Sequence, residues 1–132
     1  MPKKKTTAKL KKELDRIFSL FIRYKYADKN GYVRCYTCDT IKPVKEMQCG
    51  HWIPRNILGT RFSEKNCRPQ CVGCNMFNRG RPDVFSVNLM KEKIDIVKLQ
   101  QDRYKVFKVD STWYEGQIQN YKAKLLRMGV KI

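Results

Sequence analysis

Four of the six cysteines stand in two pairs with the spacing of a metal site. Cys35 and Cys38 form one Cys-x-x-Cys pair, and Cys71 and Cys74 form the other. Two residues between thiolates allow one tight turn to direct both sulfurs at a single ion, and two such turns complete a tetrahedral shell. We therefore expect structural zinc on all four cysteines. Two disulfides or an iron–sulfur cluster are the alternatives.

Two further cysteines, Cys49 and Cys67, lie between these pairs. We expect each to be a small buried apolar side chain rather than a ligand. Cys67 stands four residues before Cys71, so it is the one that could replace a member of the four-cysteine site.

The single histidine, His51, also lies between the two pairs, in the segment QCGHWIPR. Imidazole can take a proton from water near neutral pH, which is the step that starts hydrolysis of a phosphodiester. Asn66 follows, and Asn75 comes directly after Cys74, where it is held rigidly and can direct an amide oxygen at Mg²⁺. For each residue taken singly, a structural role as a buried histidine or as a turn or cap asparagine stays open.

The charge of the chain indicates a polyanionic partner. Lysine and arginine total 29 and aspartate and glutamate total 12 among 132 residues, so the net charge is +17. This excess favours nucleic acid over a membrane surface, with a structural part of a ribonucleoprotein particle as the alternative. Residues 1–12 carry six lysines, and we expect a basic arm whose Lys3, Lys4 and Lys5 lie along phosphates, or a solubilising tail.

No apolar run approaches the ~20 residues of a membrane span, and the N-terminus lacks the continuous apolar segment of a signal peptide. We expect an intracellular protein whose thiols stay reduced.

Helices are predicted at both ends of the chain by apolar residues at helical spacing. Residues 7–28 and 111–128 carry such stripes, the first stopped by Asn30-Gly31 and the second opened by Asp110-Ser111. They are candidates for a dimer seam or for packing around the zinc module within one chain. Between them we expect short strands at 32–35 and 47–53 and a loop at 54–60. A cysteine turn that opens a short helix is expected at 71–80, followed by helices at 82–93 and 94–109.

Three spaced pieces of sequence, in order, resemble a known family. LDRIFSLFIRYKYADKNGYVRCYTC, QCGHWIPR and TRFSEKNCRPQCVGCNMFNRG are similar to the NinG (Rap) recombination nucleases of lambda-like phages, HNH (ββα-metal) endonucleases of the four-cysteine zinc type. The resemblance implies an α+β fold, with a zinc-stapled ββα-metal module between N- and C-terminal helices. The expected divisions are a basic arm at 1–12, an N-terminal helix at 13–31, the nuclease module at 32–80 and a helical C-terminal extension at 81–132.

The resemblance also implies roles for single residues. His51 would be the general base, Asn66 would hold the loop and orient the imidazole, and Asn75 would be a ligand of a catalytic Mg²⁺ or Mn²⁺. Arg55 and Arg61 flank this region and could clamp the scissile phosphate, or be ordinary surface arginines. His51 and Asn75 would then face one hydrated cation.

One position departs from the HNH pattern. Many such enzymes carry Asp directly before the histidine, where this chain has Gly50, and Glu64 is the substitute ligand that we expect. The implied substrate is branched DNA, meaning Holliday junctions and D-loops, cut in the cytoplasm of a bacterial host if the protein is phage-encoded. Two symmetric cuts favour a homodimer. A nuclease that nicks duplex DNA, of the homing type, and a non-catalytic zinc protein that binds DNA or RNA are the alternatives.

Overall fold

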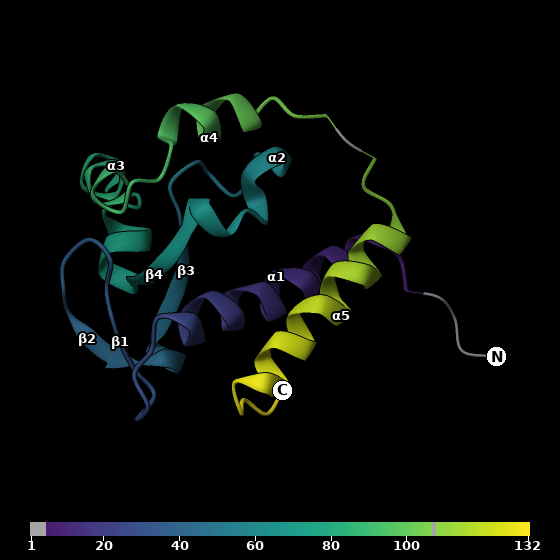
Figure 1. Ribbon diagram of the computed structural model, residues 1–132, viewed down its shortest axis with the longest axis horizontal. Helices are drawn as coiled ribbons and strands as arrows, with labels where there is room; N and C mark the ends of the chain where they lie inside the picture. Colours follow the sequence, from purple (N-terminus) through teal and green to yellow (C-terminus); the bar gives the residue numbers. More distant parts are fainter. Residues whose placement is uncertain (1–4, 107) are drawn as a thin grey trace. The chain divides into compact units, whose positions relative to one another are not determined.

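The computed structural model of the chain describes residues 5–106 and 108–132, shown as a ribbon in Figure 1. These residues form two compact units. Residues 5–21 and 108–132 make up the helix-pair unit, and residues 22–106 make up the sheet unit. The chain is a mixed α+β structure in which helices accompany two small two-stranded sheets, as the sequence predicts.

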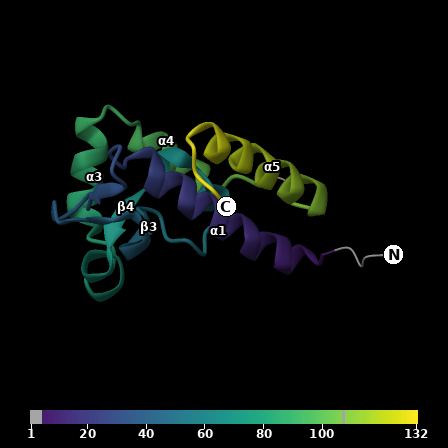
Figure 2. The same ribbon diagram turned by 90° about the horizontal axis from the view of Figure 1, so that it is seen from below.

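The helix-pair unit consists of the first part of α1 (Thr7–Lys25) and of α5 (Ser111–Arg127). The two helices lie side by side in Figures 1 and 2, and the ring of Tyr121 contacts Phe18 and Phe21 at centroid distances of 5.2 and 5.0 Å. The apolar stripes therefore pack within one chain, which was one of the two expectations, but they pack against each other rather than around the zinc module. The buried side chains of this unit are Leu10, Leu14, Ile17, Phe18, Phe21, Tyr114, Ile118, Tyr121 and Leu125.

The ends of these helices differ in part from the expected ones. Helix α1 begins at Thr7, so residues 7–12 of the expected basic arm are its first turns, and it ends at Lys25 rather than 28. Helix α5 begins where the sequence predicts, because the Asp110 carboxylate accepts a hydrogen bond from the backbone N–H of Trp113 (3.0 Å).

The sheet unit contains two antiparallel pairs of strands. In one, β1 (Tyr32–Arg34) pairs with β2 (Ile41–Pro43). In the other, β3 (Met47–His51) pairs with β4 (Cys67–Cys71), with Met47 opposite Cys71 and His51 opposite Cys67. Strand β2 was expected to be loop. It has three residues and ends in proline, so no alternation of apolar and polar residues announces it.

Short helical turns connect and follow these strands. A 3₁₀ turn, η1 (Val44–Glu46), precedes β3, whereas α2 (Leu58–Arg61) and a second 3₁₀ turn, η2 (Glu64–Asn66), lie between β3 and β4. A single π-helical turn, η3 (Gly73–Phe77), follows β4.

Two helices complete the sheet unit. They are α3 (Pro82–Lys91) and α4 (Ile96–Asp102), and the helix expected over 94–109 is therefore only seven residues long. Apolar side chains gather in two clusters, one beside the cysteine pairs and one under α3 and α4. The first contains Val33, Cys35, Val44, Met47, Cys71 and Cys74, and the second contains Ile53, Phe85, Leu89 and Leu99.

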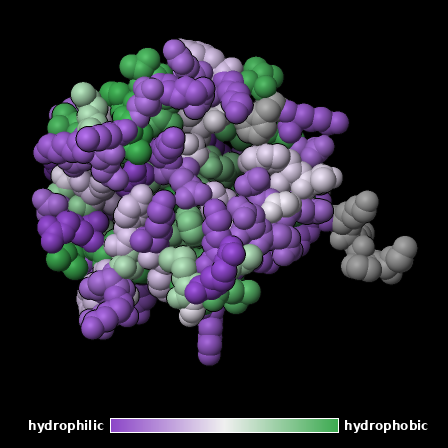
Figure 3. All heavy atoms as spheres, viewed as in Figure 1, coloured by the Kyte–Doolittle hydropathy of each residue, from purple (hydrophilic) through white to green (hydrophobic). Residues whose placement is uncertain are grey.

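Hydrophilic side chains cover most of the face seen in Figure 3, and the apolar ones on it stand in small groups. Among the described residues, no helix is both long and apolar enough to span a bilayer.

Candidate functional site

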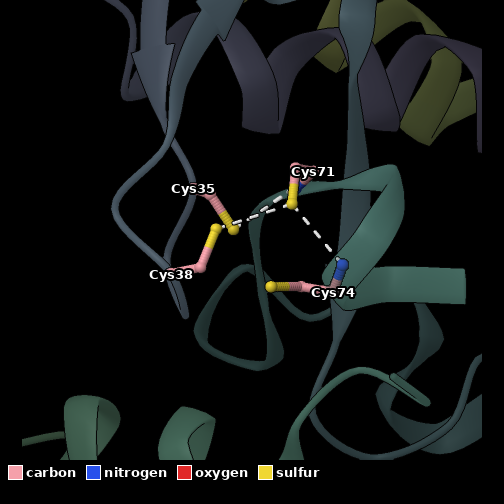
Figure 4. Close-up of side chains that lie close together, drawn as sticks. All are labelled: Cys35, Cys38, Cys71 and Cys74. Carbon is pink, nitrogen blue, oxygen red and sulfur yellow. Dashed lines mark hydrogen bonds between the residues drawn. The ribbon is translucent and has the colours of Figure 1, made fainter. Parts of the chain in front are cut away.

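The four paired cysteines come together in the sheet unit. Cys35 and Cys38 lie in the turn that follows β1, Cys71 ends β4, and Cys74 lies in η3. Their four sulfurs lie within 4.8 Å of one another, and Figure 4 shows them directed toward a common point. Cys38 Sγ and Cys71 Sγ are 3.6 Å apart. The cluster can hold a metal ion such as zinc, as the spacing predicts.

Backbone and hydroxyl groups around these sulfurs favour thiolates. The N–H of Cys71 donates to Cys35 Sγ (3.3 Å), and the N–H of Cys74 donates to Cys71 Sγ (3.4 Å). Burial opposes ionisation of Cys38, but hydrogen bonding with Thr40 brings its pKa down to about 6. Burial raises the pKa of Cys71 to about 12. A bound dication would favour the ionised form of both.

Asn66 ties together the two ends of the segment between β3 and β4. Its side chain is fully buried, and its Oδ1 accepts from the backbone N–H of Ile53 (2.8 Å). Its Nδ2 donates to the carbonyls of Ile53 (3.0 Å) and Thr60 (3.2 Å), and its own carbonyl accepts from Trp52 (2.9 Å). Because one amide satisfies three backbone groups, it fixes the chain directly after His51.

His51 is the last residue of β3 and is half-buried. Its Nε2–H donates to the carbonyl oxygen of Arg61 (2.9 Å), which leaves a lone pair on Nδ1. Burial lowers its pKa below the ordinary value. The carbonyls of Arg61 and Cys49 oppose this shift, and the charges of Arg55 and Arg61 add to it. The imidazole is therefore neutral near pH 7 and can accept a proton.

Asn75 contacts a different part of the same strand. Its Nδ2 donates to Oε1 of Gln48 (2.7 Å). Gln48 stands three positions before His51 on β3, about 10 Å along the strand, and residues at odd spacing point to opposite faces. The structure therefore does not bring His51 and Asn75 together. Sequence reasoning missed Gln48. The strand predicted over 47–53 was a signal, because the side chain next to apolar Met47 points to the opposite face of that strand.

The arginine and glutamate candidates have protein partners. Arg61 donates to the carbonyl of Arg55 (3.0 Å), and the Arg55 side chain is exposed. The Glu64 carboxylate lies 3.3 Å from the ammonium of Lys25. In the expected basic arm, Lys5 pairs with Glu13 at 2.7 Å. Lys3 and Lys4 lie outside the described residues.

Packing explains the glycine at position 50. Gly50 lies opposite Arg68 on β4, and a Cβ placed on it would stand 1.9 Å from Oε1 of Gln70. The Gln70 side chain is fully buried and donates to Thr37 (3.0 Å) and to the carbonyl of Gly80 (2.9 Å). An Asp at position 50 would require this side chain to move, so the missing carboxylate is part of how the two strands pack.

Comparison with known proteins identifies the family. No curated protein and no solved structure matches the chain. The family model described as bacteriophage lambda NinG protein matches residues 2–129, nearly the whole length. The chain therefore belongs to the NinG family, which confirms the family resemblance predicted from its sequence.

Proposed function

We propose that this protein is a metal-dependent endodeoxyribonuclease of the HNH type that cuts branched DNA intermediates of phage recombination, such as Holliday junctions and D-loops. The observation that carries the proposal is the environment of His51. The Arg61 carbonyl accepts a hydrogen bond from a neutral imidazole and so fixes the ring. Buried Asn66 binds the backbone of Ile53 and Thr60, and so holds in place the segment between them. A protein that only binds DNA has no need for such an arrangement.

The proposed role of His51 is to take a proton from the attacking water at Nδ1. A positioned general base contributes about 10²- to 10⁴-fold to the rate of such a step. Asn66 positions this base through the backbone of Ile53 and Thr60 rather than by touching the substrate. Arg55 is exposed nearby and can meet a phosphate oxygen.

The proposed divalent ion lies at Asn75. A flip of the Asn75 amide lets Asn75 and Gln48 present two oxygens to the same point, and oxygen is the ligand that Mg²⁺ and Mn²⁺ prefer. The fit is partial, because Glu64, the carboxylate that the sequence offers as a ligand, is paired with Lys25. When bound, such an ion would stabilise negative charge on the leaving oxygen.

The net charge of +17 supports a DNA substrate, because neutralising phosphates releases counterions and strengthens binding. Branched DNA is proposed because the family is associated with phage recombination. A homodimer is proposed because two related cuts resolve a junction. Light scattering of the protein alone and on a junction measures the dimer.

The test is cleavage of a labelled four-way junction, a D-loop and a linear duplex with Mg²⁺ or Mn²⁺. We expect the junction and the D-loop to be cut, and we expect His51→Ala to lose at least 100-fold in rate while binding DNA as before. Asn75→Ala should lose activity, whereas Asn78→Ala, an exposed asparagine on the same turn, should not. Cleavage by His51→Ala at the rate of the natural protein would overturn the role of His51.

The distance between His51 and Asn75 favours a second candidate function, a non-catalytic zinc protein that binds DNA. A base and a metal ligand directed to opposite faces of β3 serve one phosphate only if the strand end rearranges on DNA. The double variant His51→Ala/Asn75→Ala distinguishes the two functions. A loss no greater than that of either single variant indicates one catalytic centre. Tight binding without cleavage by the natural protein indicates the second function.

A further inference from the structure

Two groups of metal-ligating side chains occur among the described residues, and the second is separate from the four paired cysteines. It consists of Cys49, His51 and Cys67, whose ligand atoms all lie within 4.8 Å of one another. Cys67 is fully buried, as the sequence predicts, whereas Cys49 and His51 are half-buried.

The register of the β3–β4 ladder creates this group. Cys49 and His51 are two residues apart on β3, so both point to the same face, and Cys67 lies directly opposite His51 on β4. Neighbouring side chains on one face of an antiparallel pair have Cβ atoms about 5 Å apart. Two thiols and one imidazole therefore converge from a rigid ladder rather than from mobile loops.

We propose that Cys49, His51 and Cys67 form a second metal site, which takes Zn²⁺. In a tetrahedral zinc site with bonds of about 2.3 Å to sulfur and 2.0 Å to nitrogen, ligand atoms stand a little under 4 Å apart. The spacing within the group requires only a small contraction to reach this geometry.

The donor set favours zinc over harder ions. Thiolate and imidazole ligands select zinc, whereas Mg²⁺ and Ca²⁺ prefer oxygen. Two thiolates and a neutral imidazole cancel the charge of Zn²⁺, so the complex is neutral and suits a half-buried position. Three protein ligands leave the fourth coordination position open.

The carbonyl of Arg61 acts on both sides of this group. It accepts from His51 Nε2 (2.9 Å), and it lies 3.9 Å from Cys67 Sγ. Metal-binding histidines generally donate their second N–H to a carbonyl or carboxylate, which fixes the ring and its tautomer. This hydrogen bond is therefore already formed, and Nδ1 is left as the ligand atom.

The site competes with the proposed role of His51 as a base, because both use the same lone pair of the imidazole. Zinc on Nδ1 would remove the proposed general base, so excess Zn²⁺ would inhibit a nuclease that depends on this residue. The metal site itself does not depend on any nuclease activity, and it can be measured without DNA.

The test is to count zinc bound to the full chain, purified with a reductant, by native mass spectrometry. We expect two Zn²⁺ per chain in the natural protein and one in Cys49→Ala, with the same circular dichroism spectrum. Cys49 is the residue to change because it is only half-buried and its loss leaves the core intact. Thr40→Ala, beside the four paired cysteines, should retain two.

Cadmium-113 NMR provides a second measurement. The natural protein should give two resonances, and Cys49→Ala and His51→Gln should each lose the same one. One zinc per chain in the natural protein under excess Zn²⁺, or two in Cys49→Ala, would overturn the proposal. A Cys49–Cys67 disulfide that persists in protein purified with a reductant would also overturn the proposal. If zinc counts are as expected but no DNA is cut, the metal site stands and the nuclease fails.

Discussion

The interiors of the helix-pair unit and of the sheet unit are stabilised by different interactions. In the first, the buried side chains are apolar apart from the tyrosine hydroxyls and lie at helical spacing on α1 and α5. In the second, two apolar clusters accompany four thiols, and all four buried polar or charged side chains of the described residues lie there. These are Thr60, Asn66, Arg68 and Gln70.

This difference shows what each unit needs in order to fold. Helix packing needs only apolar area removed from water, at about 25 cal/mol per Å². The sheet unit has strands of only three to five residues and buries polar side chains, which cost free energy wherever a hydrogen-bond partner is lost. Such a unit would gain more than the helix pair from a metal ion on the four cysteines that can hold one, and it relies more on single hydrogen bonds.

Loss of a metal ion from the four paired cysteines should produce the largest difference in stability between the two units. Cys38→Ser changes an exposed side chain, so it removes a ligand with little change in packing. A structural zinc site contributes on the order of 10 kcal/mol to folding. We expect the amides of β1 to β4 to lose hydrogen-exchange protection while those of α5 keep it. Asp39→Ser is the control, and equal loss in both units would contradict the comparison.

Removing buried apolar volume from α5 should instead destabilise the helix-pair unit and leave the sheet unit stable. Leu125 is fully buried, and Leu125→Ala should lower the free energy of unfolding of the helix pair by about 2–5 kcal/mol. Leu126 is 66% exposed, so Leu126→Ala should change it by no more than about 0.5 kcal/mol. Urea denaturation followed by circular dichroism measures both. Similar effects of the two variants would show that this face of α5 is not packed.

Removing a single amide should weaken the sheet unit. Asn66→Ala leaves the N–H and the carbonyl of Ile53 and the carbonyl of Thr60 without this partner, and each such buried group costs about 1–3 kcal/mol. Because the costs of groups that share one partner are not additive, we expect a total of roughly 2–4 kcal/mol. Exposed Asn56 provides the control, Asn56→Ala, in the same urea measurement. A loss below 0.5 kcal/mol for Asn66→Ala, as for a surface residue, would refute the role.

The smallest effect is expected at the ion pair of Arg68, whose side chain is only 3% exposed. Its guanidinium contacts the Glu92 carboxylate (3.2 and 3.3 Å) and the rings of Tyr26 and Tyr36. Burial alone would raise the pKa of Glu92, but hydrogen bonds from Tyr36 and Arg68 bring it below its ordinary value. The carboxylate is 39% exposed, so screening limits its contribution to about 1 kcal/mol or less.

The sign of the pH dependence follows from the lowered pKa of Glu92. The contribution is present above the pKa of the unfolded chain, about 4.3, and is lost as the pH falls through the lower pKa of the folded protein. Glu92→Gln should therefore be less stable than the natural protein at pH 7, and the difference should shrink as the pH falls from about 4.3 toward 3. Exposed Glu46→Gln should show no such trend in thermal unfolding. A difference that is as large at pH 3 as at pH 7 would assign the effect to packing.

Local signals predicted the parts of the fold that are locally determined. The stripes of α1 and α5 and the Asp110 cap are properties of adjacent residues, and so is the pairing of thiols in each Cys-x-x-Cys turn. The prediction was too long over 94–109, where the helix covers only Ile96–Asp102. Strand β2 was missed because three residues carry too little pattern and depend on their partner β1.

The amino-acid sequence by itself determined the four cysteines that can hold a metal ion, the net positive charge, the outer helices and the family, because each depends on composition or on neighbouring residues. Only the tertiary structure decided what surrounds His51. The register of β3 on β4 placed Cys67 opposite it, and α2 brought the Arg61 carbonyl to its ring. Strand alternation directed Gln48, which Asn75 contacts, to the other face of β3. These contacts join residues far apart in the chain, and one residue of slip between two strands would change every one of them.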